Sequence, residues 1–542
     1  MRDPEGPEAP GLGQEALDLR QEALDLRQEA LDPRQEALDP RQEATAHLRG
    51  SALLLTGRVL SLGFGFVTQV VIVRSLSASA FGAFAYAMSW VALGQLFCGL
   101  GLQRSLGLFL GRYDHDGDDA RVLGLLRLVS LTIVASAGVL VVTVLAGQAL
   151  TGGHLLDDRL ASSLLAILVV LAPLQGGDDL VSGLLAYLGK ARAIFVRQYL
   201  LEPGFKLAVV AALVLTGSHV RTLALGYVVA SSVGLLLYGR ALRSALDERG
   251  LRERMRGLRP IVPWGQVLSY TLPLLTTDLV AVCFTSVDGV LLGHYRDASA
   301  VGALRVIAPL AALNLLVFTS FTLLYAPAAS RLHARGDLDA VADLYWRTTT
   351  WIAVLTFPVL AVTTVLAEPL TTLLFGQRYA TSSTYLVLLS VGSYVSAAVG
   401  FNGLTTRVFG LLRFTLVVNA LAVVVNLGLG LVLIPRYGAL GAALAVGLSL
   451  TVHNLLKQVG LRRCLGRAFS PRRFGLPFVA IAGGACVLGA THLVWGNTVL
   501  PSLLAATLSS VVVGAAGLRT LDIGEVWQRT PARGTRSAAA GP

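Results

Sequence analysis

The sequence predicts an all-α polytopic membrane protein with about 14 transmembrane helices. Hydrophobic residues make up 54% of its 542 residues, charged residues make up only 14%, and the mean hydropathy is +0.66. This composition is too apolar for a soluble globular protein. From Ser51 onward, apolar runs of about twenty residues follow one another, each long enough to cross ~30 Å of hydrocarbon. The net charge of +11 does not indicate nucleic-acid binding, because the arginines lie in short loops between apolar runs.

The apolar runs define fourteen predicted spans. We place them at residues 52–73, 81–103, 122–147, 160–188, 194–216, 220–239, 267–292, 300–328, 345–367, 383–406, 411–434, 438–459, 475–493 and 498–518. Basic residues concentrate in every second loop, which by the positive-inside rule predicts that both termini are cytoplasmic. The N-terminus lacks the basic region of a signal peptide, so we expect the first span to act as an uncleaved anchor. Only Lys190, Lys206 and Lys457 are lysines among 44 basic residues, and the chain is rich in Ala, Gly and Leu. This composition is typical of a GC-rich coding sequence and favours a bacterial protein, so we expect the chain to lie in a bacterial cell membrane.

Residues 14–43 repeat a seven-residue unit, QEALDLR or QEALDPR. Seven is the period of a coiled coil, but each unit has few apolar positions, and Pro33 and Pro40 would break a continuous helix. We therefore predict a disordered cytoplasmic tail over residues 1–48, with a short helical partner site as the alternative. A second cytoplasmic tail is expected over residues 520–542.

Two short matches indicate an internal repeat. ASAFGAF at 78–84 matches ASAVGAL at 298–304, and LVLTG at 213–217 matches LVLIP at 431–435, both at an offset close to 220 residues. Because the matches occupy equivalent topological places, we predict a parallel six-plus-six repeat with a substrate path between two pseudo-symmetric lobes. The predicted domains are an N-lobe of helices 1–6 (51–240), a basic cytoplasmic linker (241–262), a C-lobe of helices 7–12 (263–461) and helices 13–14 (474–519).

Charged side chains inside apolar helices mark candidate transport residues, because a charge at the bilayer centre costs roughly 2.5 to 3.5 kcal/mol. The first half carries Asp178, Asp179, Arg197, Glu202 and Lys206, which are predicted to form one polar network. Like charges oppose joint ionisation, so Asp178, Asp179 and Glu202 are candidates for proton or sodium coupling. Glu202 and Lys206 stand four residues apart, and mutual neutralisation is the alternative.

Two sites of weakened backbone accompany these charges. Gly176 and Gly177 are expected to loosen the fourth helix beside its acidic pair. Pro203 removes a backbone hydrogen bond from the fifth helix. Broken helices are tolerated where neighbours or water satisfy the freed groups, so both sites favour a polar cavity.

The second half carries Asp278 and Asp288 in one helix and Arg305 in the next, joined by the turn HYRDAS. The 220-residue offset puts Arg58 of the first helix opposite Asp278, with a structural ion pair between lobes as the alternative. The predicted substrate-cavity residues are therefore Arg58, Arg197, Lys206 and Asp278. Asp288 and Arg305 lie near outer helix ends and are predicted to form an outer gate.

No enzyme signature stands out in the chain. The GxSxG, P-loop, HExxH and paired CxxC patterns are missing, and the four cysteines have neither disulfide nor metal-ligand spacing. We therefore expect no enzyme activity and no cofactor or metal. Without an ATP site, the work of transport would come from an ion gradient, by proton or sodium, or from the substrate gradient.

Several stretches resemble one known family of transporters. They are GRVLSLGFGFVTQVVIVRSLSASAFGAF, FCGLGLQRSLGLFLGRY, LPLLTTDLVAVCFTSVDGVLLGHYRDASAVGAL and LFGQRYATSSTYLVLLSVG followed by VVNALAVVVNLGLGLVLIPRYGALGAALAV. Across about Gly57 to Leu461 the chain resembles the polysaccharide-export flippases of the MOP (MATE-like) superfamily, with a departure at Ala303-Leu304, where relatives usually have an aromatic residue. The resemblance implies two six-helix lobes in a V, two extra C-terminal helices and alternating access.

The resemblance also implies the cargo, a polyprenyl-diphosphate-linked oligosaccharide moved from the cytoplasmic to the outer leaflet for cell-surface polysaccharide biosynthesis. The partners would be this lipid-linked glycan, the bilayer, and glycan polymerases or glycosyltransferases. Within the superfamily the alternatives are a lipid II flippase and a cation-coupled multidrug exporter. Outside it, they are a membrane glycan ligase or glycosyltransferase, which would need larger external loops, and a transport-inactive scaffold.

Overall fold

The computed structural model describes residues 40–520 except 99, 218, 466–470 and 497. Most of the predicted N-terminal tail with its heptad repeats, and the predicted C-terminal tail, lie outside the described residues. The described chain is helical, and fourteen of its helices are long and apolar enough to cross a membrane, from Thr56–Ser75 to Val499–Thr520. The prediction of an all-α protein with fourteen spans is confirmed.

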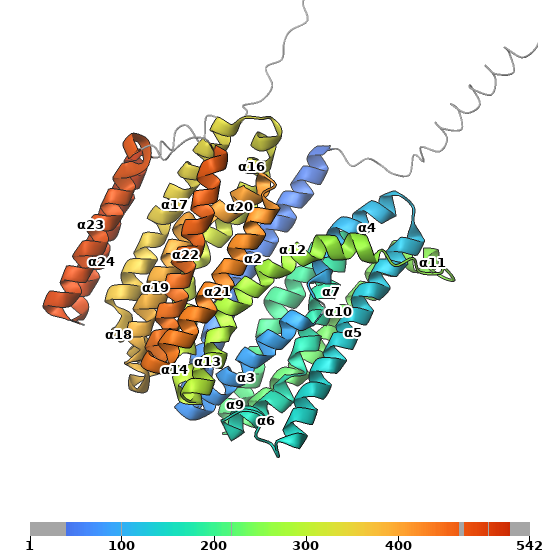
Figure 1. The fold of residues 1–542 in the computed structure, drawn as a ribbon, viewed down its shortest axis with the longest axis horizontal. Coiled ribbons are helices and arrows are strands. Elements are labelled where there is room, and N and C mark those ends of the chain that lie inside the picture. The colour runs from blue at the N-terminus through green and yellow to red at the C-terminus, as the bar shows by residue number, and fades with distance from the viewer. Residues whose placement is uncertain (1–39, 99, 218, 466–470, 497, 521–542) are drawn as a thin grey trace, which may run out of the picture. The chain divides into compact units, whose positions relative to one another are not determined.

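Figure 1 labels the elements. The first six spans and their connections comprise α2 (Pro40–Ser75), α3 (Ala78–Phe97), η1 (Leu102–Ser105), α4 (Leu106–His115), α5 (Asp119–Leu150), α6 (Arg159–Leu168), α7 (Leu171–Tyr187), α8 (Ala191–Ile194), η2 (Phe195–Leu201), α9 (Glu202–Thr216) and α10 (Val220–Glu248). α2 thus includes the last residues of the predicted tail. Residues 53–542 form one compact unit, which is described below.

The linker helix α11 (Leu251–Arg254) precedes the other eight spans. These comprise α12 (Trp264–Val282), η3 (Cys283–Val287), α13 (Asp288–Tyr295), α14 (Ala298–Arg305), α15 (Ala308–Ala312), η4 (Leu313–Leu315), α16 (Leu316–Ala334), α17 (Leu338–Val365), α18 (Ala367–Phe375), η5 (Gln377–Tyr379), α19 (Ser382–Val399), α20 (Phe401–Val408), α21 (Leu412–Tyr437), α22 (Ala439–Leu465), α23 (Pro471–Trp495) and α24 (Val499–Thr520).

The fourth span is broken, but not where its glycines predict. Helix α6 ends at Leu168 and α7 begins at Leu171, because Pro173 has no N–H to donate to the Val169 carbonyl. The carbonyl accepts instead from Ala172, three residues on, at 3.2 Å. α7 then runs without interruption through Gly176 and Gly177, so these two glycines do not break the helix. A Cβ on either glycine would contact a neighbouring helix, at 3.5 Å and 3.1 Å respectively, which indicates a packing role.

The fifth and seventh spans each contain a π-helical segment directly before a carboxylate. The segment η2 ends at Leu201, and the N–H of Glu202 bonds to the carbonyl of Arg197, five residues back. Pro203 follows at the start of α9, and the sequence predicts the hydrogen bond that this proline cannot make but not the π-helical turn that accommodates its loss. The segment η3 precedes Asp288 in the same way, without a proline.

The linker between the two sets of six spans is partly helical. Helix α10 continues beyond its predicted end at residue 239 to Glu248, where Ala245 and Leu251 of α11 belong to one small apolar cluster. Arg254 then forms ion pairs with Asp114 at 3.1 Å and Asp119 at 2.6 Å. These carboxylates raise the pKa of Arg254 above its usual value and tie the linker to the ends of α4 and α5.

The first and second sets of spans meet where α3 packs against α14. The N-caps of the two helices, Ser77 and Asp297, stand 220 residues apart and accept from Ala80 N and Ala300 N at 3.1 Å and 2.7 Å. A Cβ on Gly82 would lie 2.0 Å from the Ala298 carbonyl oxygen, and one on Gly302 would lie 3.0 Å from the Gly82 Cα. The glycines therefore allow the two backbones to touch. We call this contact the α3–α14 joint.

The cap on α14 gives a pH-dependent prediction. The backbone N–H of Ala300 and the hydroxyl of Ser299 hold the pKa of the Asp297 carboxyl below its usual range. A carboxylate with a depressed pKa contributes stability above the unfolded pKa of about 4, and this stability is lost as the pH falls through the lower folded pKa. We expect Asp297→Ala to cost about 1 kcal/mol near neutral pH and progressively less below pH about 4.

Thermal unfolding of the detergent-solubilised protein between pH 7 and pH 3 measures this loss. The matched variant Ser77→Ala removes the equivalent cap without a titratable group, so its cost should stay constant with pH. A cost for Asp297→Ala that does not shrink at low pH would contradict the account.

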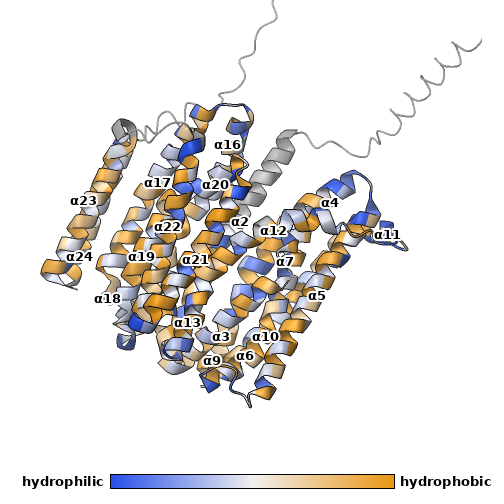
Figure 2. Cartoon of the chain, in the orientation of Figure 1, coloured by the Kyte–Doolittle hydropathy of each residue, from blue (hydrophilic) through white to orange (hydrophobic). Residues whose placement is uncertain are grey.

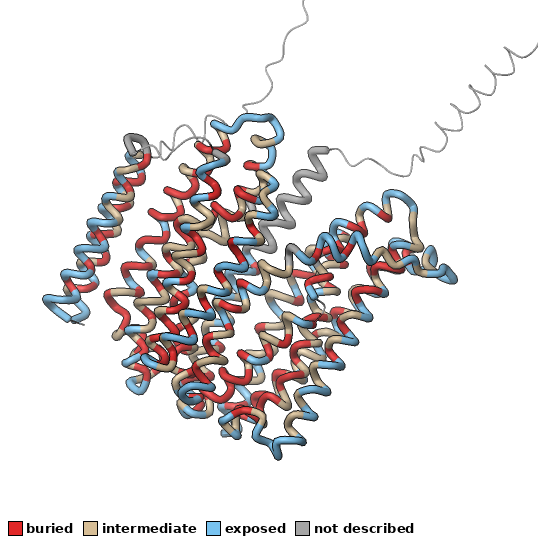
Figure 3. Tube along the Cα trace, in the orientation of Figure 1, coloured by how far each residue is buried: buried red, intermediate tan, exposed pale blue. Residues whose placement is uncertain are grey.

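The outer surface of the helices is apolar. Leu131, Val134 and Val139 of α5 are 66%, 69% and 68% exposed. Figure 2 shows hydrophobic residues along most of α5, and Figure 3 shows that exposed and buried positions alternate along it. This inversion of the soluble-protein pattern is expected for helices whose solvent is lipid.

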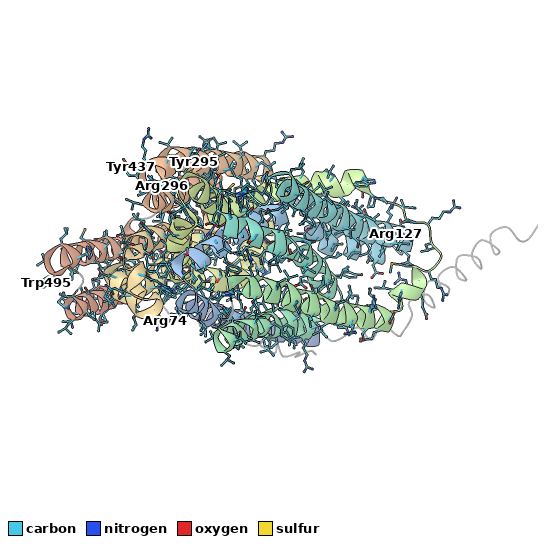
Figure 4. The ribbon with its side chains drawn as sticks, turned by 90° about the horizontal axis from the view of Figure 1, so that it is seen from below. Arg74, Arg127, Tyr295, Arg296, Tyr437 and Trp495 are labelled. Atoms are coloured by element: carbon cyan, nitrogen blue, oxygen red, sulfur yellow. The ribbon has the colours of Figure 1, made fainter. Side chains whose placement is uncertain are left out.

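Exposed aromatic side chains mark the ends of three odd-numbered spans. Tyr295, Tyr437 and Trp495 are 43%, 56% and 54% exposed at the ends of α13, α21 and α23. Figure 4 shows Tyr295, Arg296 and Tyr437 close together, and Arg296 donates to the carbonyls of Pro435 and Arg436 at 2.8 Å and 3.1 Å. Odd-numbered spans all end on one side of the membrane, so these residues form part of an interfacial aromatic belt.

Candidate functional site

A cavity of about 680 Å³ lies between the first and second sets of six spans, beside the α3–α14 joint. We call it the central cavity. Residues of α2, α3, η2, α9 and α10 line one side, and residues of η3, α14 and α15 line the other. Its charged lining residues are Glu202, Lys206 and Arg305, two cations and one carboxylate. The volume falls in the range of ligand sites, about 300–1,000 Å³.

A chain of ion pairs runs from the wall of the central cavity into the first set of spans. Lys206 Nζ lies 2.7 Å from a Glu202 oxygen, and the other Glu202 oxygen lies 3.5 Å from Arg197. Arg197 in turn lies 2.5 Å from Asp178. The sequence predicts these four residues and Asp179 as one polar network, and the structure links the four by ion pairs. Two acids and two bases balance each other, which lowers the cost of holding charges within a membrane span.

Arg197 is the most deeply buried member of this chain. Its residue is 3% exposed, and its guanidinium carbon lies 5.9 Å from the centre of the Tyr238 ring. A Cβ on Gly234 would lie 2.6 Å from Arg197 Nη2, so α10 has room for the guanidinium only because it carries glycine there. Arg197 therefore lies behind the cavity wall. It positions Asp178 and Glu202 instead of lining the central cavity.

Arg305 lines the central cavity from the second half. Its guanidinium donates to the backbone carbonyl of Thr285 in the π-helical segment and, at 3.1 Å, to Ser89 Oγ of α3. The arginine therefore bridges η3 and α3 at the border of the α3–α14 joint.

Asp288 and Arg305, the two residues predicted to form an outer gate, make no direct hydrogen bond to each other in this structure. The Asp288 residue is only 3% exposed, and among the described residues neither of its carboxylate oxygens has a hydrogen-bond partner within 3.5 Å. It faces α21 instead, where a Cβ on Gly430 would lie 3.5 Å from Asp288 Oδ1 and Asn426 is a polar neighbour. The extra residue in the π-helical turn sets the direction of this side chain, which sequence spacing does not reveal.

A second cavity of about 440 Å³ holds the other two acidic candidates. We call it the acidic cavity. Asp179 of α7 and Asp278 of α12 line it together with residues of α3 and η1. Asp179 thus points to a different cavity from its neighbour Asp178. The predicted carboxylate pair is divided between two environments.

Arg58 lies outside both cavities. It is exposed on α2, whereas Asp278 is half-buried in the acidic cavity. The structure therefore does not place Arg58 and Asp278 together in the central cavity as the repeat offset predicts. Equivalent positions in a repeat share a place in the topology, but the helices that carry them have different neighbours. The neighbouring helices determine which residues each side chain contacts.

The structure adds polar residues that the sequence reasoning missed. Ser89, Tyr238 and Asn426 contact or neighbour the charged candidates, as described above. A signal existed for Asn426, because Asn419 and Asn426 stand seven residues apart on one face of an apolar helix. The described residues contain no group of three or more His, Cys, Asp and Glu side chains that could hold a metal ion.

Comparisons with known proteins bear on both the fold and the family. A family model described as polysaccharide biosynthesis protein matches residues 47–333, more than half of the chain. None of the curated proteins compared with the sequence matches it.

Several solved structures share the fold at low sequence identity. The lipid II flippase MurJ in an inward closed conformation is 14% identical with a TM-score of 0.64, over 88% of this chain and 99% of that one. An inward-facing multidrug resistance MATE family transporter of the MOP superfamily is 13% identical with a TM-score of 0.58, over 75% and 94%. A MOP superfamily transporter from Pyrococcus furiosus, described by the reverse polarity of its binding pocket, is 14% identical with a TM-score of 0.52, over 78% and 95%.

Proposed function

Because this chain belongs to the polysaccharide biosynthesis protein family, we propose that it translocates a polyprenyl-diphosphate-linked oligosaccharide from the cytoplasmic to the outer leaflet. The observation that carries the proposal is the central cavity, in which Lys206 and Arg305 outnumber Glu202. The MOP fold shared with the solved transporters supports alternating access as the mechanism.

The charge of the cavity suits a diphosphate. Moving a phosphate anion from water into a membrane-embedded cavity requires cations and donors that replace its hydration. Arg305 provides a planar guanidinium that can donate two parallel hydrogen bonds to phosphate oxygens, and Lys206 provides a compact ammonium. An incoming diphosphate would compete with Glu202 for Lys206, while Glu202 keeps its second partner, Arg197. The polyprenyl chain would stay in the lipid.

We also propose that the carboxylates behind and beside the cavity couple transport to a proton or sodium gradient. Asp178 and Glu202 share Arg197, so protonation or cation binding at either would change the charge balance around Lys206. Asp179, in the acidic cavity with Asp278, is the candidate that is not in this chain of ion pairs. Transport by Asp178→Asn and Asp179→Asn variants across a range of pH tests the two sites separately.

A lipid II flippase is the second candidate. The match to MurJ covers 88% of this chain and 99% of that chain, whereas the inward-facing MATE transporter covers 75% of this chain. Lipid II also carries a polyprenyl diphosphate, so the same cations would serve it, and the saccharide decides between the candidates. A multidrug exporter is less well supported, because its cationic substrates would be repelled by Lys206 and Arg305.

Deletion of the gene tests the proposal. We expect a lipid-linked oligosaccharide to accumulate on the inner leaflet, measured by lipid extraction and mass spectrometry. Accumulation of lipid II would select the second candidate. Acquired drug sensitivity without any accumulating lipid-linked saccharide would overturn the proposal.

The cations of the central cavity give the matched prediction in vitro. Removing one charge-assisted contact to phosphate costs about 1.5–3 kcal/mol, so Lys206→Gln and Arg305→Gln should slow flipping of a fluorescent polyprenyl-diphosphate glycan about ten- to hundredfold. Dithionite quenching in proteoliposomes measures the rate. Arg221→Gln, an exposed change on α10, should leave it unchanged. Equal rates for all three variants would exclude the central cavity as the diphosphate site.

A further inference from the structure

A third cavity, of about 340 Å³, lies within the second set of spans. We call it the basic cavity. Its walls come from α12, η3, α16, α19, α20 and α22, and it shares no lining residue with the central cavity or the acidic cavity. Its charged lining residues are Arg407 and Lys457, and none of its lining residues is acidic.

Lys457 is a half-buried lysine without a protein partner. In the described part of the chain, its ammonium makes no hydrogen bond or ion pair. A Cβ on Gly403 of α20 would lie 3.3 Å from Lys457 Nζ, so the ammonium rests over a position that lacks a side chain. Arg407 follows Gly403 by four residues on the same face of α20, which brings the two cations to one cavity.

The neighbouring polar groups are already satisfied by the protein. The Asn454 amide donates to the Leu450 carbonyl at 2.9 Å and to Ser396 Oγ at 3.3 Å. His453 Nε2 lies 3.1 Å from Asn419 Oδ1, and the amide nitrogen of Asn419 donates to Thr277 Oγ1 at 3.2 Å. These bonds hold the cavity wall in place. Lys457 is therefore the lining group that retains unused donors.

An ammonium without a partner is unfavourable at a half-buried position within a membrane span, and Lys457 lies within the span Ala439–Arg463. Arg407 is exposed near the end of the span Ser382–Val408 and lines the same cavity. An anion bound beside Lys457 would satisfy the ammonium and would lie within the same cavity as the Arg407 guanidinium. A phosphate is the class of anion that best matches an arginine and a lysine together.

We propose that the basic cavity is a second anion site, separate from the central cavity, that binds a phosphate group. Its volume is large enough to hold a phosphate or diphosphate. The phosphate can come from the headgroup of an anionic membrane phospholipid or from a free phosphate anion in the aqueous phase. The site goes beyond the proposed transport of a lipid-linked glycan, because none of its residues lines the central cavity.

Binding to the purified full chain tests the site. Inorganic pyrophosphate is titrated by calorimetry into the detergent-solubilised protein, in the natural sequence and in a Lys206→Met background that weakens binding in the central cavity. Phospholipid binding is measured by native mass spectrometry of protein from nanodiscs containing phosphatidylglycerol and phosphatidylcholine. Lys457→Met and Arg407→Gln are the test variants, on two different helices, and each must elute as a monodisperse peak. Arg463→Gln, an exposed change on the same helix as Lys457, is the matched control.

The expected result is an about tenfold loss of affinity in each test variant, from the loss of one charge-assisted contact, and no change in Arg463→Gln. If the test variants lose affinity only for pyrophosphate, the natural ligand is a free phosphate anion. If they lose affinity only for phosphatidylglycerol, the natural ligand is a lipid headgroup. Binding that is unchanged in both test variants, or that falls equally in Arg463→Gln, overturns the site. If one test variant fails to purify, the other decides. The readout is binding, so failure of glycan transport leaves this test intact.

Discussion

Replacing Gly302 by leucine is expected to separate α3 from α14 and to shift the protein away from the conformation described here. A Cβ at Gly302 would lie 3.0 Å from the Gly82 Cα and 3.3 Å from the Ala78 carbonyl oxygen. These neighbours are backbone atoms, so they cannot swing aside as a side chain can. Overpacking of this kind costs about 1–3 kcal/mol. If this cost destabilises only the conformation in which α3 and α14 are in contact, the equilibrium between that conformation and one in which the two helices are separated shifts roughly five- to 150-fold.

Spin labels at Ser79 and Ser299, two exposed positions on the facing helices, report the separation of the joint. They are attached through cysteines in a chain whose four native cysteines are replaced. Pulsed electron resonance should show a short distance in the parent and a longer, broader distribution in Gly302→Leu. Gly428→Leu is the matched control, because nothing lies within 4 Å of a Cβ at this exposed position on α21. An unchanged distance distribution in Gly302→Leu would contradict the role given to the joint.

Replacing Arg197 by glutamine is expected to cause the largest loss of stability. The residue is 3% exposed, and it pairs with Asp178 at 2.5 Å and with Glu202 at 3.5 Å. Removing one partner of a buried ion pair costs about 3–5 kcal/mol, because the remaining charge is left uncompensated. Lys206 would still pair with Glu202, so the uncompensated charge falls mainly on Asp178.

A second substitution distinguishes this account from simple loss of packing. Asp178→Asn in the Arg197→Gln background removes the stranded carboxylate, so the double variant should recover part of the lost stability. The exposed Arg192→Gln removes the same charge from the same span and should stay near the parent. Thermal unfolding followed by size-exclusion chromatography ranks the four proteins. A double variant less stable than Arg197→Gln would rule out the stranded charge as the cause.

Much of the fold could be predicted from local sequence alone. Each of the fourteen apolar runs becomes a span, because the length of apolar sequence that crosses a bilayer depends on few other features. The break in the fourth span and the π-helical turn before α9 both follow from prolines, Pro173 and Pro203, whose missing N–H acts within one turn. Gly176 and Gly177 leave α7 continuous, and an added Cβ at either position would contact a neighbouring helix, which local sequence does not reveal.

The candidate site could be predicted only where its partners are close along the chain. Glu202 and Lys206 stand four residues apart on one helix, and that spacing already predicts their pairing. The link from Arg197 to Asp178 joins two helices, and the sequence predicts it only as membership of one polar network. The basic cavity was missed because its two cations come from α20 and α22, and neither has a signal beyond its charge.

The sequence therefore determines which residues are available inside the membrane, and the tertiary structure decides what each one meets. Hydropathy, caps and prolines act over one or a few turns, so spans, the turn at Asp297 and the charged residues within helices can all be located from the chain. The exposure of Arg58, the turning of Asp288 toward α21 and the division of Asp178 and Asp179 between two cavities depend on neighbouring helices. Helix packing sets those neighbours through glycines such as Gly82, Gly234 and Gly302, whose role becomes visible only when two backbones or a side chain occupy the space beside them.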